Sequence, residues 1–129
     1  MIMMNPLAGK NILAIDDTPS IRTFLRISLQ SQGAHFHEAA TAEEGLNKSQ
    51  LIQPEIVVLD LGLPDRDGLD ILPDILKNEN NPAVIILSVR KEQRTRDLAF
   101  NLGACGYVTK PFIMEDLLDV IQEQLTRSI

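Results

Sequence analysis

The chain has 129 residues, of which 12 are Lys or Arg and 18 are Asp or Glu, so its formal net charge is −6. This length fits one domain with its own core, and the contents of 44% apolar and 23% charged residues exclude general disorder. The acidic balance argues against a surface for nucleic acid or anionic membranes, because phosphate groups are bound by clusters of Lys and Arg.

The first half of the chain alternates short apolar runs with segments of helical period. Strands are predicted at the apolar runs 11–15, 35–39 and 56–59. The first helix is predicted over 20–32, because its apolar stripe ends before Gly33. Thr41 and Glu44 have the spacing of a capping box, which predicts the start of the second helix there.

The second half repeats this alternation after a loop dense in turn residues, 61–68. Strands are predicted at 83–87 and 106–108, and helices over 69–77, 92–102 and 114–127. Pro73 falls within one of these helices, and we expect it near the first turn, where backbone N–H groups lack helical partners anyway. The whole pattern predicts an α/β fold: a (βα)5, doubly wound, five-stranded parallel sheet between two layers of helices.

Polar residues follow four of the predicted strands: Asp16 and Asp17, Asp60, Ser88 and Lys110. The carboxyl ends of parallel strands meet at one edge of the sheet, so we expect these side chains to converge. Three carboxylates repel one another unless a cation lies among them, and an oxygen-only set suits Mg²⁺. With a hydroxyl and an ammonium for phosphate oxygens, the set predicts a phosphoryl-transfer site in which the central Asp60 is the nucleophile.

Each of these residues alone has a simpler explanation. Asp16 and Asp17 could cap the first helix, and Asp60 could be a turn residue. Lys110 and Pro111 alone would be an ordinary turn ahead of a helix. The prediction of a functional site therefore depends on their joint position at the strand ends.

With these residues the sequence resembles the receiver domain of bacterial two-component response regulators, over about residues 10–127. The matching segments are Asp16–Asp17, 58–68, 86–88 and 103–112, of which the Asp60-to-Gly68 stretch and Lys110-Pro-Phe112 are the most specific. The resemblance implies a flavodoxin-like sheet with strand order 2-1-3-4-5. It also implies that 1–129 is a single receiver domain, with 1–9 as an N-terminal extension.

The same resemblance implies a function for the site. Asp60 accepts a phosphoryl group from a sensor histidine kinase or a phosphotransfer protein, in a single turnover followed by slow autodephosphorylation, so the domain is not an enzyme. Mg²⁺ is bound by Asp16, Asp17, Asp60 and the backbone carbonyl of Gly62. Lys110 pairs with the phosphate.

A switch and an output are implied as well. Ser88 moves toward the phosphoryl group and Tyr107 changes rotamer with it, which alters the surface of the fourth helix, fifth strand and fifth helix. An output domain or partner protein reads this surface, with transcription as one output, and a homodimer forms through the same surface. The Lys110–Pro111 peptide bond is implied to be cis.

The sequence departs from the family pattern in three ways. Val89 stands where Ala or Gly is usual and is expected to narrow access to Asp60, while Arg90 is expected to touch phosphate or a donor. In regulators with a winged-helix output, an acidic pair precedes the switch aromatic, and an Arg in the last helix of the second subunit pairs with it across a dimer. Here Cys105, Gly106 and Val120 occupy those positions, which leaves the type of output open.

Three other functions remain as alternatives. A degenerate receiver would serve only as a protein-interaction module, for which Val89 is the sole support. An aspartate-nucleophile phosphatase would need a general acid two residues after Asp60, where Gly62 stands. A fold that binds a flavin phosphate would need a loop rich in Ser, Thr and Gly after the first strand, where Asp16 and Asp17 would repel phosphate.

We expect a cytoplasmic protein without contact to membranes or, through this domain, to nucleic acid. No apolar run approaches the ~20 residues that span a bilayer, and residues 1–10 have no basic region before a long apolar stretch, so they fit a signal peptide poorly. The single cysteine, Cys105, cannot form an internal disulfide and is expected to be a small packed residue.

Overall fold

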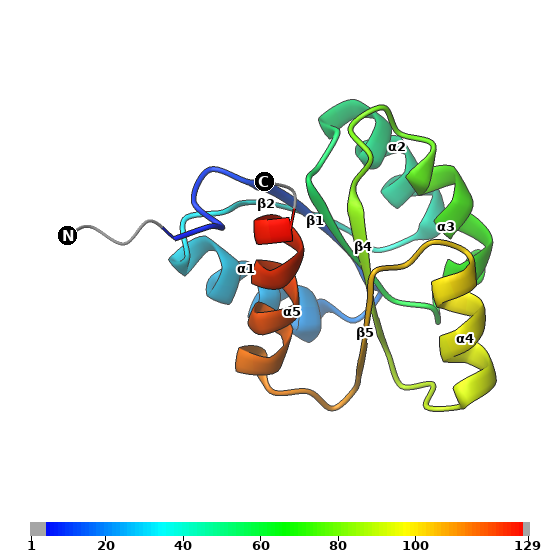
Figure 1. Ribbon diagram of the computed structural model, residues 1–129. Helices are drawn as coiled ribbons and strands as arrows, with labels where there is room; N and C mark the ends of the chain where they lie inside the picture. The colour runs from blue at the N-terminus through cyan, green and yellow to red at the C-terminus, as the bar shows by residue number, and fades with distance from the viewer. Residues whose placement is uncertain (1–4, 128–129) are drawn as a thin grey trace.

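Five parallel strands form one sheet in the order β2-β1-β3-β4-β5 (Figure 1). They are β1 (Asn11–Ile15), β2 (His35–Ala39), β3 (Ile56–Leu59), β4 (Ala83–Ser88) and β5 (Gly106–Thr109). The predicted fold class and strand order are therefore confirmed. This computed structural model describes residues 5–127, so residues 1–4 of the expected N-terminal extension lie outside the described residues.

Helices cover both faces of the sheet, as Figure 1 shows. They are α1 (Pro19–Ser31), α2 (Ala42–Ile52), α3 (Gly68–Leu76), α4 (Gln93–Asn101) and α5 (Met114–Arg127). Helices α1 and α5 pack on one face, and α2, α3 and α4 pack on the other. None of the helices within residues 5–127 has both the length and the apolar character needed to cross a bilayer.

The central strands are buried on both faces, which explains their lack of polar alternation. In β3, Val57 and Leu59 belong to the core under α2, α3 and α4, whereas Ile56 and Val58 belong to the core under α1 and α5. All four residues are at most 2% exposed. Packing on both faces thus fixes the positions of the central strands β1, β3 and β4. The loops that follow their carboxyl ends therefore begin at well-defined positions.

The start of α2 follows the predicted cap only in part. The Thr41 hydroxyl accepts a hydrogen bond from the Glu44 N–H at 3.1 Å, as expected of an N-cap. The Glu44 carboxylate, however, accepts from the N–H of Ala40 at 3.0 Å, one residue before the cap. The reciprocal half of the capping box is therefore shifted by one residue.

Helix α3 begins earlier than the sequence indicates. The Asp67 carboxylate accepts a hydrogen bond from Leu69 N–H at 2.9 Å and acts as N-cap, so Gly68 is the first helical residue. Pro73 is consequently the sixth residue of the helix, and the expectation that it lies near the first turn was wrong. Its ring leaves the Leu69 carbonyl without the usual i→i+4 partner, because proline has no N–H to donate.

Candidate functional site

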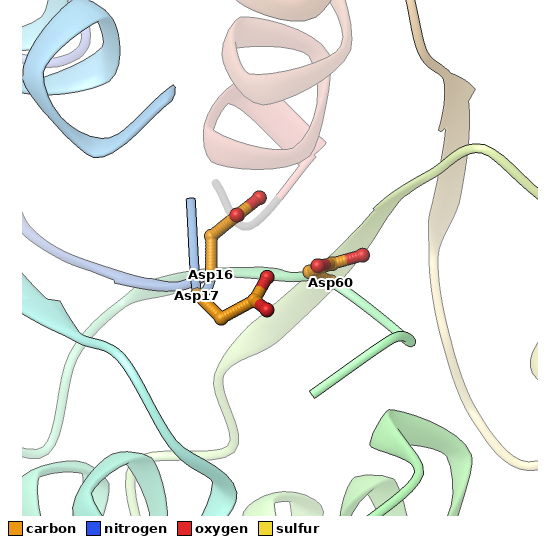
Figure 2. Close-up of side chains that lie close together, drawn as sticks. All are labelled: Asp16, Asp17 and Asp60. Atoms are coloured by element: carbon orange, nitrogen blue, oxygen red, sulfur yellow. The ribbon is translucent and has the colours of Figure 1, made fainter. Parts of the chain in front are cut away.

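Three carboxylates meet at the carboxyl edge of the sheet (Figure 2). Asp16 and Asp17 follow β1, Asp60 follows β3, and one carboxylate oxygen from each lies within 4.8 Å of those of the other two. Asp16 and Asp60 are buried, whereas Asp17 is exposed. The Asp60 N–H donates to the carbonyl of Ile15 at 2.8 Å, which holds the end of β3 against the end of β1. The predicted convergence of these three side chains is confirmed.

Lys110 brings an ammonium group to the two buried carboxylates. Its Nζ lies 2.8 Å from Oδ2 of Asp16 and 3.6 Å from Oδ2 of Asp60, and its side chain is only 13% exposed. The Lys110 N–H donates to the Ser88 carbonyl at 2.8 Å, directly after the paired ends of β4 and β5. The Lys110–Pro111 bond is cis, which matches the expectation.

Negative charge exceeds positive charge in this cluster. Burial raises the pKa of Asp60 above its ordinary value, and the nearby Asp16 carboxylate raises it further. Lys110 and the Gly62 N–H, which donates to Asp60 Oδ1 at 3.3 Å, lower the pKa but do not cancel that effect. A divalent cation would balance the charge, and an all-oxygen donor set is what Mg²⁺ prefers. The residues present therefore fit a magnesium ion.

The two predicted switch residues are linked through the backbone of residue 90. The buried Ser88 hydroxyl accepts a hydrogen bond from the Arg90 N–H at 3.1 Å. The Tyr107 hydroxyl donates to the Arg90 carbonyl at 2.7 Å, and the Arg96 guanidinium lies 4.8 Å from the centre of the Tyr107 ring. A movement of the Ser88 hydroxyl would therefore shift the backbone of Arg90, to which the Tyr107 hydroxyl is bonded.

The Arg90 side chain is directed to a residue that sequence reasoning missed. Its Nη1 lies 2.9 Å from Oδ2 of Asp67, the N-cap of α3. This ion pair connects the loop after β4 with the loop after Asp60. The contact of Arg90 with phosphate or a donor stays a prediction. The adjacent Val89, which was expected to narrow access to Asp60, is largely exposed, at 69%.

Asp65 also went unnoticed in the sequence. Its two carboxylate oxygens accept hydrogen bonds from the N–H groups of Ala42 and Glu43, at 2.8 and 3.0 Å. These bonds lower the pKa of Asp65 and tie the loop after β3 to the N-terminus of α2. The composition of the loop marked it as a turn, but no sequence signal identified the helix end that it caps.

Cys105 is half-buried, as expected of a packed residue. Its Sγ donates to the Val84 carbonyl at 3.4 Å, and burial raises the pKa of the thiol. It therefore has no features of a reactive cysteine.

Comparisons with known proteins identify relatives of this chain. The family model described as "Response regulator receiver domain" matches residues 12–122. The KDP operon transcriptional regulatory protein KdpE of Escherichia coli is 37% identical over 117 residues, which are 91% of this chain and 52% of that protein. PhoP of Bacillus subtilis, an alkaline phosphatase synthesis transcriptional regulatory protein, is 32% identical over 93% of this chain and 50% of its own length. The chain thus spans about half the length of these curated relatives.

Solved structures resemble the fold closely. A receiver domain protein described as CheY-like from Methanospirillum hungatei superposes with a TM-score of 0.88 at 30% identity, covering 93% of this chain and 96% of that one. The BeF3-activated DrrB receiver domain gives a TM-score of 0.84 at 32% identity, covering 92% and 99%.

Proposed function

This chain belongs to the response regulator receiver domain family, and from that premise we propose that Asp60 is its phosphoryl acceptor. Phosphorylation of an aspartate by a kinase is the general function of the family. The observation that carries the assignment is the position of Asp60: buried at the end of β3, within 4.8 Å of two other carboxylates and 3.6 Å from an ammonium. Asp16 shares these surroundings, but its two carboxylate oxygens already accept from the Thr18 N–H at 2.9 Å and from Lys110 at 2.8 Å, whereas Asp60 lies farther from the ammonium.

Transfer would proceed by attack of a carboxylate oxygen of Asp60 on the phosphorus of a phosphohistidine. The new O–P bond forms as the P–N bond breaks, and the electron pair of that bond returns to the imidazole ring. Lys110 would pair with one phosphoryl oxygen, and the Ser88 hydroxyl would donate to another. Asp16, Asp17, Asp60 and the Gly62 carbonyl would hold Mg²⁺, which supplies charge neutralisation of the phosphoryl oxygens when bound.

The partners follow from the same proposal. The phosphoryl donor is a sensor histidine kinase or a phosphotransfer protein in the cytoplasm. The chain receives one phosphoryl group in a single turnover and loses it slowly, so it acts as a switch rather than as a multiple-turnover enzyme. This domain itself binds neither nucleic acid nor membrane.

The output surface is the face formed by α4, β5 and α5. Movement of Ser88 and Tyr107 would alter this face for an output domain, a partner protein or a second copy of the chain. The two relatives named above are transcriptional regulators, which supports transcription as the output.

Phosphorylation in vitro tests the assignment. The protein is incubated with acetyl phosphate and Mg²⁺, and its intact mass is measured. We expect one added phosphoryl group in the wild type and in Asp74→Asn, whose exposed carboxylate pairs, among the described residues, only with Lys77 at the end of the same helix. We expect none in Asp60→Asn. Equal phosphorylation of Asp60→Asn would refute the assignment, and an unphosphorylated wild type would favour the degenerate interaction module.

A further inference from the structure

Arg22 connects β2 to the backbone of the acidic pair. It lies in the first turn of α1, and its Nη1 donates to the carbonyl of Asp16 at 2.8 Å. Its Nε donates to Oε1 of Glu38 at 2.9 Å. The Arg22 side chain is only 18% exposed, so one guanidinium spans two partners beneath the surface.

The Asp16 carbonyl lies in the peptide plane that leads into Asp17. The Asp17 carboxylate is exposed, and it has neither a hydrogen bond nor an ion pair with any residue between 5 and 127. Asp16, by contrast, is held by Lys110 and by the N–H of Thr18, which donates to its Oδ1 at 2.9 Å. The direction of the Asp17 side chain therefore depends on its backbone, and Arg22 fixes the peptide plane on its N-terminal side.

Glu38 is a firm anchor for Arg22. It lies on β2, where it pairs in register with Ala14 of β1. Arg26 donates to its second carboxylate oxygen at 3.1 Å. Burial raises the pKa of Glu38, but the hydrogen bonds from Arg22 and Arg26 outweigh this and keep the pKa below its ordinary value. Glu38 is thus ionised at neutral pH, and its negative charge offsets the charge of Arg22.

We propose that Arg22 is a positioning residue for the divalent cation: anchored by Glu38, it holds the Asp16–Asp17 peptide so that the Asp17 carboxylate faces the other two. This inference rests on the proposed function, because it concerns the Mg²⁺ of that site. Arg22 itself does not touch the cation. It acts as an outer partner that orients a ligand.

The direction in which Mg²⁺ affinity changes when Arg22 is replaced distinguishes a positioning role from a simple effect of its charge. Removal of a cation near a metal site strengthens Mg²⁺ binding by Coulomb attraction alone. Removal of a positioning contact weakens it. Arg26 is the matched control, because it lies one turn along the same helix and binds the same Glu38 but makes no contact with Asp16.

Calorimetric titration of Mg²⁺ into the purified chain is the main test. We expect Arg22→Met to raise the dissociation constant about tenfold, the lower end of the effect of outer-shell partners on metal affinity. We expect Arg26→Met to stay within about twofold of the wild type, because it leaves the Asp16 carbonyl bond in place. Both variants lose one bond to Glu38, and Arg22→Met also loses the bond to the Asp16 carbonyl. A merely structural role would therefore lower the unfolding temperature more in Arg22→Met than in Arg26→Met and leave Mg²⁺ affinity unchanged in both.

A second readout needs no metal. Amide relaxation measured by NMR in the metal-free protein should show a lower order parameter at Asp17 in Arg22→Met than in Arg26→Met. If Arg22→Met does not fold, Arg22→Lys replaces it. This variant keeps the positive charge but lacks the planar fork that reaches both partners, so we expect a smaller loss of Mg²⁺ affinity in the same direction.

The outcomes are distinct. Unchanged or tighter Mg²⁺ binding by Arg22→Met, with a wild type that binds Mg²⁺, overturns the role of Arg22 and leaves the proposed function intact. A wild type that binds no Mg²⁺ overturns the metal site and this inference together.

Discussion

The residue proposed as phosphoryl acceptor, Asp60, lowers the stability of the fold when its carboxyl group is ionised. The residue is 7% exposed, and both burial and Asp16 raise the pKa of its carboxyl group. The folded protein therefore holds the proton of Asp60 more tightly than the unfolded chain does. Between the ordinary pKa of 3.8 and the raised value, stability falls as pH increases, because the folded state binds more protons. Above that window the ionised side chain destabilises the fold.

Asp60→Asn should consequently stabilise the metal-free protein. We expect a higher unfolding temperature than the wild type at pH 7 in the presence of a chelator. The gain should shrink as pH falls through the raised pKa of Asp60 and vanish below its ordinary pKa, where the wild-type carboxyl is neutral as well. Thermal melts between pH 3 and 7 measure this, within the range in which both proteins fold. A gain that does not depend on pH would contradict the argument, and Asp74→Asn is the control.

At the scale of elements, α3 is seated directly on the end of β3. The Gly68 N–H donates to the Leu61 carbonyl at 2.8 Å. A Cβ at Gly68 would lie 2.4 Å from the carbonyl oxygen of Asp60 and 2.8 Å from Cα of Leu61. Both neighbours are backbone atoms of the two residues that follow β3, and hydrogen bonds to Ile15 and Gly68 hold this segment, so they cannot move aside cheaply. The glycine that helps to identify the family thus has a packing reason in this chain.

Gly68→Ala should therefore destabilise the fold, and Gly62→Ala should not. We expect a loss of about 1–3 kcal/mol for Gly68→Ala, as for other overpacked sites. At Gly62, in the same loop, nothing lies within 4 Å of an added Cβ, so we expect a change below about 1 kcal/mol. Urea unfolding of both variants gives the comparison. Equal urea midpoints for the two variants would contradict this, because they would show that the backbone near Gly68 moves to accommodate the added methyl group.

Elements with strong local patterns were predictable from the sequence, and contacts between loops were not. The apolar runs of β1, β3 and β4 and the stripe of α5 fixed the order of elements, and the strand ends then indicated which polar residues converge. The N-cap Thr41 and the position of Glu44 in α2 were predicted correctly, whereas the start of α3 was predicted one residue late, because it depends on the Asp67 carboxylate that caps it. The partners of Arg22 and Asp67 could not be predicted, since each lies on a different element and no periodic pattern relates them.

At the scale of the whole molecule, the site concentrates negative charge in a chain whose formal net charge is already −6. Asp16, Asp17 and Asp60 lie on loops after two central strands, and Lys110 alone among the described cations pairs with them. A ligand that binds only the assembled site stabilises the folded state by mass action. Because these residues are far apart in the unfolded chain, Mg²⁺ should act as such a ligand.

Mg²⁺ should thus raise the unfolding temperature of the wild type, and Asp17→Asn should remove most of that increase. At a concentration about tenfold above the dissociation constant, mass action adds about 1.4 kcal/mol, which shifts the melting temperature of a domain of this size by roughly 3–6 °C. Asp17 suits the test because it is exposed and unpaired among residues 5–127, so its replacement should leave the metal-free melting temperature nearly unchanged. Melts in MgCl₂ and in NaCl of equal ionic strength separate specific binding from screening. An equal Mg²⁺ shift in Asp17→Asn would mean that the cation binds elsewhere on this acidic surface.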